Sequence, residues 1–201
     1  MKLYEQALLF ILDHGKGWVF SSSDLLEKFS RSQADNLLSE LVKEKKIRKI
    51  ARGMYECPKY SDFLEEYLGP DIDQVAQAYA RKFKWRVEIL GESALNMLGL
   101  STQIVAKYVY LTDGTNRIYD ILGTTLEFKK STLKDIGYEH KESSLIVQAL
   151  KALGKEHISD EVILKIRKKI DSKMYGKVLQ DTKNSTGWIY EAIKLICKAE
   201  V

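Results

Sequence analysis

The chain has 201 residues, of which 45% are hydrophobic and 30% are charged, and its formal net charge is +4. This balance excludes a largely disordered chain, and the length allows one domain or two small ones with real cores. Two cysteines are too few for a disulfide framework or a zinc module, so we expect both in the core. No apolar run approaches the roughly 20 residues of a membrane span. The N-terminus lacks a signal-peptide pattern, and we therefore expect a cytoplasmic protein.

Residues 3–57 predict three helices and a hairpin. In the first helix, Leu3, Ala7, Leu8, Ile11 and Leu12 share one face, and glycines at positions 15 and 17 end it. A capping box, Ser21 followed by Asp24, predicts a second helix with Leu25, Leu26 and Phe29 facing inward.

A second capping box, Ser30 followed by Gln33, opens a longer helix. Its inner face is predicted from the helical spacing of Ala34, Leu37, Leu38, Leu41 and Val42. Residues 47–50 and 54–57 then predict two strands joined by a tight turn, in which Gly53 can adopt the positive φ that such turns need.

A cluster of cations follows the third helix and runs into the hairpin. Its members are Lys43, Lys45, Lys46, Arg48, Lys49 and Arg52, with Glu44 as the only acid among them. Such a stripe can neutralise phosphates, and it can equally be a solvated surface.

The only two prolines, Pro58 and Pro70, bracket a predicted connector at residues 61–70. We therefore predict one domain at 1–60 and a second at 71–201. In the second domain the pattern predicts a helix at 71–83, a strand at 86–90, a short helix at 93–98, strands at 107–111, 117–122 and 125–129, and helices at 142–153, 160–181 with a break near 175–176, and 187–199. The predicted fold class is α+β: an N-terminal winged helix-turn-helix followed by a mixed α+β domain that ends in helices.

Helix, turn, longer helix and basic hairpin within about 55 residues are typical of a winged helix-turn-helix. Short polar side chains on the exposed face of the third helix can reach base edges, while the cations at its ends and on the hairpin can hold phosphates. The residues that we expect to contact DNA are Arg31, Ser32, Gln33, Asn36, Ser39, Lys43, Lys46, Arg48, Lys49 and Arg52. The alternative is a three-helix interaction module with a solvated outer face.

Enzymatic signatures are weak. The turn at residues 91–93 could resemble the phosphate-binding turn of a nucleotidyltransferase, but no pair of carboxylates follows that could hold Mg²⁺. His14, His140 and His157 are far apart and lack partners at metal-ligand spacing. We therefore expect no enzyme, no metal and no cofactor.

Three segments resemble AbiEi-type antitoxins of abortive-infection toxin–antitoxin systems: residues 46–55 (KIRKIARGMY), 91–103 (GESALNMLGLSTQ) and 110–114 (YLTDG). The resemblance covers roughly residues 1–130, and the C-terminal helices match more loosely. One departure is that the predicted recognition helix carries acidic Asp35 and Glu40.

The resemblance implies two roles. The winged domain would bind inverted repeats in its own double-stranded promoter DNA as a repressor, an arrangement compatible with a homodimer. The second domain would counteract a nucleotidyltransferase-like toxin, in the type IV manner that does not require a stable complex. The alternative is a winged-helix transcriptional repressor with no toxin partner.

Overall fold

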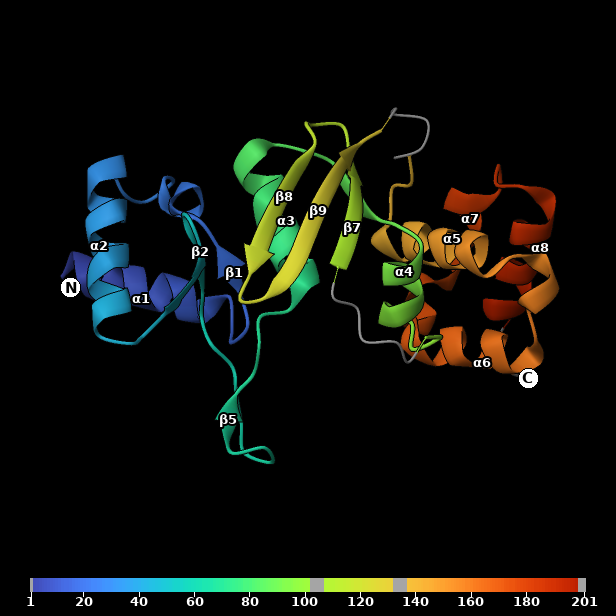
Figure 1. Ribbon diagram of the computed structural model, residues 1–201, viewed down its shortest axis with the longest axis horizontal. Helices are drawn as coiled ribbons and strands as arrows, with labels where there is room; N and C mark the ends of the chain where they lie inside the picture. Colours follow the sequence, from blue (N-terminus) through green and yellow to red (C-terminus); the bar gives the residue numbers. More distant parts are fainter. Residues whose placement is uncertain (1, 102–106, 132–136, 199–201) are drawn as a thin grey trace. The chain divides into compact units, whose positions relative to one another are not determined.

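The computed structural model describes residues 2–101, 107–131 and 137–198, and its architecture is mixed α+β, as predicted (Figure 1). The chain forms two compact units. Unit 1 contains Met1–Trp85 and Ile118–Leu126, and unit 2 contains Arg86–Arg117 and Glu127–Val201. The chain therefore does not divide at the predicted connector. Unit 1 continues through the following helix because that helix contacts preceding elements of the same unit.

Unit 1 begins with a helix, a short strand, a turn of 3₁₀ helix, a longer helix and a hairpin. These elements are α1 (Leu3–Asp13), β1 (Val19–Phe20), η1 (Ser22–Leu25), α2 (Arg31–Lys43), β2 (Arg48–Ala51) and β3 (Met54–Glu56). The three strands form an antiparallel sheet in the order β1-β3-β2. The hydrophobic core beneath them includes Ala7, Ile11, Phe20, Leu25, Ala34, Leu37, Leu38 and Leu41.

Two details of the predicted N-terminal helices are wrong. The second helix is only the four-residue η1, although its capping box is present, with the Ser21 amide donating to the Asp24 carboxylate at 2.8 Å. Leu26 lies beyond it and is 43% exposed. In α1, Ala7 and Ile11 are buried, whereas Leu3 and Leu12 face solvent, so the apolar face is narrower than predicted.

The predicted connector contains a second hairpin, formed by β4 (Tyr60–Ser61) and β5 (Glu66–Tyr67). Its tip carries the most exposed large apolar side chain of the described residues, Phe63, at 93% exposure. Three acids, Asp62, Glu65 and Glu66, surround the tip. The hairpin is followed by α3 (Ile72–Phe83), which lies within the helix predicted at 71–83 and has Asp71 as its N-cap.

The second part of the chain forms a four-stranded sheet and a group of helices. The strands are β6 (Val87–Ile89), β7 (Lys107–Thr112), β8 (Arg117–Ile121) and β9 (Thr124–Lys130), in the sheet order β6-β7-β9-β8. The helices are α4 (Glu92–Met97), α5 (Lys141–Leu153), η2 (Lys155–His157), α6 (Asp160–Lys169), η3 (Ser172–Met174), α7 (Tyr175–Thr182) and α8 (Gly187–Ile196). The predicted strands and helices are present among the described residues. The last helix ends at Ile196, and residue 199, its predicted end, lies outside the described residues. The long helix breaks at residues 170–174, where Asp171 caps η3, rather than near 175–176.

Unit 2 holds two carboxylates around the start of α5: Glu88 is buried, and the side chain of Asp181 is 10% exposed. Asp181 accepts hydrogen bonds from the backbone N–H groups of Glu139 and His140, both at 3.0 Å. Glu88, on β6, accepts one from the N–H of Tyr138 at 3.4 Å. The two cysteines are buried free thiols, as predicted. Within the described ranges, none of the helices has the length and apolar character needed to cross a bilayer.

Candidate nucleic-acid interface

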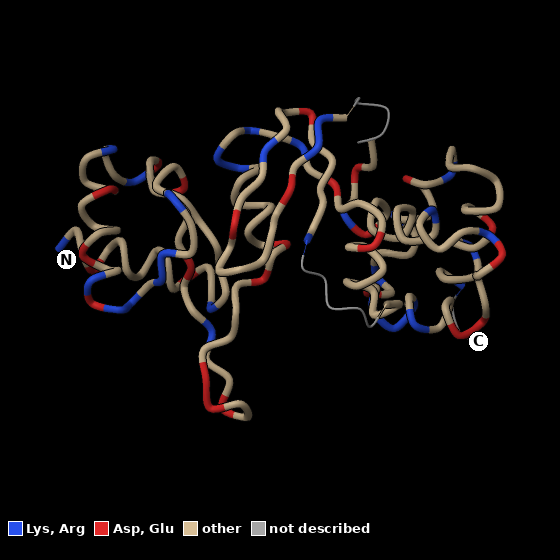
Figure 2. The backbone as a smooth tube through the Cα atoms, viewed as in Figure 1, with Lys and Arg blue, Asp and Glu red and all other residues tan. Residues whose placement is uncertain are grey.

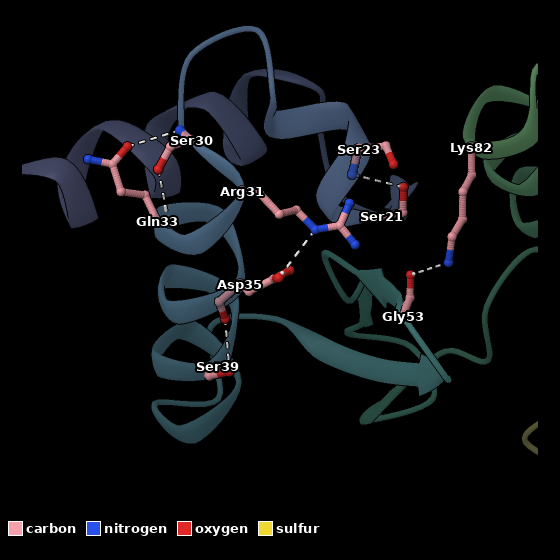
Figure 3. Close-up of polar contacts among 9 residues, drawn as sticks. All are labelled: Ser21, Ser23, Ser30, Arg31, Gln33, Asp35, Ser39, Gly53 and Lys82. Carbon is pink, nitrogen blue, oxygen red and sulfur yellow. Dashed lines mark hydrogen bonds and ion pairs between the residues drawn. The ribbon is translucent and has the colours of Figure 1, made fainter.

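The candidate interface starts at the N-terminus of α2, where a capping box fixes the helix. The backbone N–H of Gln33 donates to the Ser30 hydroxyl at 3.3 Å, and the backbone N–H of Ser30 donates to the side-chain oxygen Oε1 of Gln33 at 2.9 Å (Figure 3). The capping box thereby satisfies two of the N–H groups at the helix start that have no partner within the helix, those of Ser30 and Gln33. Gln33 was predicted as a DNA contact, but its side-chain oxygen serves this cap.

The exposed face of α2 presents short polar side chains, as predicted. Ser32, Asn36 and Ser39 are all exposed, and the Ser39 hydroxyl donates back to the Asp35 carbonyl at 2.9 Å. Arg31 Nε pairs with Asp35 Oδ2 at 3.2 Å, and the two side chains are 64% and 55% exposed. Such an exposed pair contributes little to stability, so Arg31 can exchange this carboxylate for another anion.

The β2–β3 hairpin keeps its apolar side chains inside and its cations outside. Lys49 pairs with Tyr55 and Ala51 with Met54, with a bulge between them. Gly53 has φ +69° in the turn, a conformation that side-chain-bearing residues rarely adopt. The bulge and turn leave Lys49 and Arg52 exposed, while Ile50 and Met54 are buried.

Arg48 does not belong to this outer set. It lies opposite Glu56 in the strand register, and its Nε donates to Glu56 Oε2 at 2.9 Å. Its Nη2 also contacts that carboxylate and donates to the Leu68 carbonyl at 2.8 Å. Glu56 is buried, which raises its pKa, and the Arg48 guanidinium only partly opposes that shift. Arg48 was predicted to hold phosphates; it instead neutralises a buried carboxylate and lies outside the candidate interface.

The remaining cations form what we call the cationic surface, which consists of Lys43, Lys45, Lys46, Lys49 and Arg52. All five are exposed, and within the described part of the chain none takes part in an ion pair. Figure 2 shows the cations that follow the end of α2. The one acid among them, Glu44, accepts a hydrogen bond from the Tyr4 hydroxyl on α1, which raises the pKa of Tyr4 to about 12.

The surface of unit 1 thus combines an exposed polar helix face with a cationic hairpin. Among the described residues, no cluster of His, Cys, Asp or Glu could hold a metal ion. Gly91, considered above as part of a phosphate-binding turn, has φ +56° and leads from β6 directly into the six-residue α4. The observed arrangement of described residues on unit 1 offers hydrogen-bond donors and positive charge to a ligand.

These features define an α+β protein with a helix and a hairpin that display cations on one compact unit. The chain belongs to DUF6088, a family of unknown function, whose family model matches residues 7–178. The matched segment includes the whole candidate interface and most of unit 2. No curated protein matches the chain.

Proposed function

We propose that unit 1 binds double-stranded DNA as a winged helix-turn-helix. The observation that carries the proposal is the order α1-β1-η1-α2-β2-β3 with the sheet order β1-β3-β2, because it places an exposed polar helix beside a cationic hairpin. In this class of domain, the second helix of the helix-turn-helix lies in the major groove and the hairpin contacts the backbone. Here these elements are α2 and β2–β3.

Each group of residues has a distinct role in this proposal. Phosphates are held by the cationic surface and by Arg31, because lysine and arginine supply sequence-independent attraction. Base edges are read by Ser32, Asn36 and Ser39, of which Asn36 can form a bidentate pair with adenine. Asp35 and Glu40 repel phosphates, so the cations beyond residue 42 carry most of the backbone contact.

We further propose that the protein represses its own promoter and counteracts a nucleotidyltransferase-like toxin. This role rests on the resemblance to AbiEi-type antitoxins rather than on the geometry of unit 2. A transcriptional repressor with no toxin partner remains the second candidate, since the features of unit 1 favour it equally.

Fluorescence anisotropy with labelled duplexes tests the DNA-binding proposal. One duplex carries the region upstream of the protein's own gene, and a second carries a scrambled version of it. We expect both to bind with strong salt dependence and the upstream duplex to bind more tightly. Asn36→Ala should narrow the difference between the two duplexes, by about 1–3 kcal/mol for a lost bidentate contact, and leave scrambled-duplex affinity nearly unchanged. Absence of binding to either duplex at low salt would exclude the proposal.

Co-expression separates the two proposed cellular roles. The full chain is expressed from an unrelated promoter together with the gene that adjoins its own, and growth is scored. Protection against a toxic neighbour supports the antitoxin role. Repression of a reporter behind the protein's own promoter without any protection supports the repressor alone.

A further inference from the structure

The β4–β5 hairpin projects from the rest of unit 1 and ends in an apolar and acidic tip, residues 62–66 (Figure 1). Phe63 is 93% exposed and Leu64 is 53% exposed, and the acids around them are Asp62, Glu65 and Glu66. Within the described ranges, none of these acids takes part in an ion pair. A hairpin of two strands is only marginally stable in water unless its apolar side chains pack against another surface. The tip therefore has the composition of an interaction surface, with an apolar centre and a charged rim.

The same unit has a cavity of about 400 Å³ at the base of this hairpin. Lys59 and Leu68 belong to its lining, and they close the base through a backbone hydrogen bond of 2.9 Å. His14 and Trp18 also line the cavity, and their rings are stacked with centroids 3.8 Å apart. The volume exceeds the roughly 150 Å³ in which a protein cavity can hold a benzene ring. The cavity can therefore receive the side chain of a phenylalanine.

The cavity carries two cations that are complementary to the acids of the tip. Lys16 and Lys59 are both exposed, and neither takes part in an ion pair with another described residue. Lys16 also approaches the thiol of Cys57, but burial raises the pKa of that thiol, which therefore stays neutral at pH 7. The positive charge of both lysines is thus available to attract an acidic partner.

Two acids also belong to the lining, and both have partners within unit 1. Glu56 is paired with Arg48. The carboxylate of Asp71, the N-cap of α3, accepts a hydrogen bond from the N–H of Asp73 at 2.8 Å and lies at the positive end of the α3 dipole. These contacts offset the negative charge of both acids, so the two lysines determine which charge the cavity attracts.

We propose that the tip of one copy of the chain binds in the cavity of a second copy, whose own tip binds in the first cavity in return. Phe63 fills the cavity, and the acids of the tip face Lys16 and Lys59. Because tip and cavity lie at opposite ends of one hairpin, two hairpins that run side by side in opposite directions form both contacts at once. Such an exchange is self-complementary and closes as a twofold dimer. The inference does not depend on DNA binding, since both contacts form without DNA.

Sedimentation velocity of the full chain, without DNA and over a range of concentrations, tests the dimer. We expect an equilibrium of monomer and dimer. Phe63→Ser should weaken the association by about 30-fold or more, as for an aromatic side chain at the centre of an interface. A matched control is Leu164→Ser, which removes a side chain that is 46% exposed on α6 and should leave the equilibrium unchanged.

Two charge-reversed variants test which surfaces meet. One variant carries Asp62→Lys and Glu65→Lys at the tip, and the other carries Lys16→Glu and Lys59→Glu at the cavity. Each variant alone brings like charges together at both contacts and should be monomeric. An equimolar mixture should form a heterodimer, because each tip then meets a cavity of opposite charge.

Three results would overturn the inference. If the wild-type chain stays monomeric at every concentration, the tip binds a protein of another kind. If Phe63→Ser leaves the dimer as stable as in wild type, the copies associate through another surface. If the mixture of charge-reversed variants stays monomeric, the tip does not meet the cavity of the second copy.

Discussion

The carboxylates of Glu56 in unit 1 and of Asp181 and Glu88 in unit 2 are held by different partners. In unit 1, Glu56 faces the guanidinium of Arg48 across the β2–β3 pair. In unit 2, Asp181 and Glu88 accept hydrogen bonds from backbone N–H groups at residues 138–140. Burial alone would raise the pKa of Asp181, but these hydrogen bonds, together with the side chains of Ser143 and His140, outweigh it and hold the pKa below its ordinary value. For Glu88, burial dominates and the pKa is raised.

This difference between the partners of the carboxylates indicates which cationic side chains are available to bind a ligand. An arginine that neutralises a buried acid is withdrawn from the surface, whereas Asp181 is held by backbone N–H groups, with His140 Nδ1 3.5 Å from its carboxylate, and among the described residues uses no arginine or lysine. In the hairpin, Arg48 therefore serves stability, and the nearby Lys49 and Arg52 remain free for a polyanion. Stability and binding should consequently separate cleanly between residues only a few positions apart.

The largest effect is expected from Arg48→Ala. The substitution leaves the carboxylate of Glu56, whose side chain is 2% exposed, without the arginine that neutralises it. It also removes a hydrogen-bond donor to the Leu68 carbonyl. We expect a loss of about 3 kcal/mol in the free energy of unfolding, at the low end for breaking a buried pair. Urea denaturation followed by circular dichroism measures it. The double variant Arg48→Met with Glu56→Leu is the control and should recover part of the loss. Wild-type stability in Arg48→Ala would contradict the pairing.

A smaller loss is expected from Asp181→Ala in unit 2. The change leaves the N–H groups of Glu139 and His140 without their carboxylate acceptor. Hydrogen bonds to charged groups contribute about 1.5–3 kcal/mol, so we expect a loss of about 2 kcal/mol in chemical denaturation. Asp181→Asn keeps one acceptor oxygen and should lose less. Equal losses for both substitutions would show that the hydrogen bonds are not responsible.

The acid in β6 should give a pH-dependent effect. Because the native pKa of Glu88 is raised, the native state binds more protons than the unfolded state between the ordinary value of 4.5 and the native value. Stability contributed by this group therefore falls as the pH rises through that window. Glu88→Gln should flatten the profile there and match or exceed wild-type stability at pH 7. A profile unchanged by the substitution would rule out Glu88 as the titrating group.

The smallest effect on stability is expected from the double substitution Lys49→Ala and Arg52→Ala. Both side chains are exposed, and surface substitutions usually change stability by less than about 0.5 kcal/mol. Their effect on the proposed DNA binding should be large, with the salt slope reduced in magnitude by about 1.8 for two phosphates. Anisotropy and denaturation on the same samples give both values. If the double substitution destabilises the protein as much as Arg48→Ala does, Lys49 and Arg52 also contribute to stability, and the proposed separation of stability and binding within the hairpin is wrong.

Local signals predicted much of the fold. The capping residues Ser30 and Asp71 open helices where expected, and Gly53 adopts the positive φ that its turn requires. The buried face of α2 also follows its helical spacing. The predictions were weaker where tertiary packing decides. The second helix is only a 3₁₀ turn, and the predicted connector forms β4–β5, whose strands have only two residues each.

The candidate site was only partly accessible from sequence. Counting outward from the turn at Gly53 would not have found the role of Arg48, because it places Lys49 opposite Glu56, and only the bulge between Lys49 and Ala51 shifts the register so that Arg48 lies there. Nor does such a count lead to the cavity at the base of β4–β5, where Lys16 and Lys59 come from segments far apart in the sequence. Contacts of this range depend on packing between elements, and a periodic pattern within one element carries no information about them.

The β4–β5 hairpin has one further consequence, which concerns cleavage of the chain. In a single copy of the chain, Phe63 at its tip is 93% exposed and Leu64 is 53% exposed, so a chymotrypsin-like protease should cut the monomer here first. The segments on either side are linked by side chains as well as by the backbone, through Arg48 to Leu68 and Arg81 to Asp24. The two fragments should therefore stay associated after the cut, migrating as one species in a native gel and separating only under denaturing conditions.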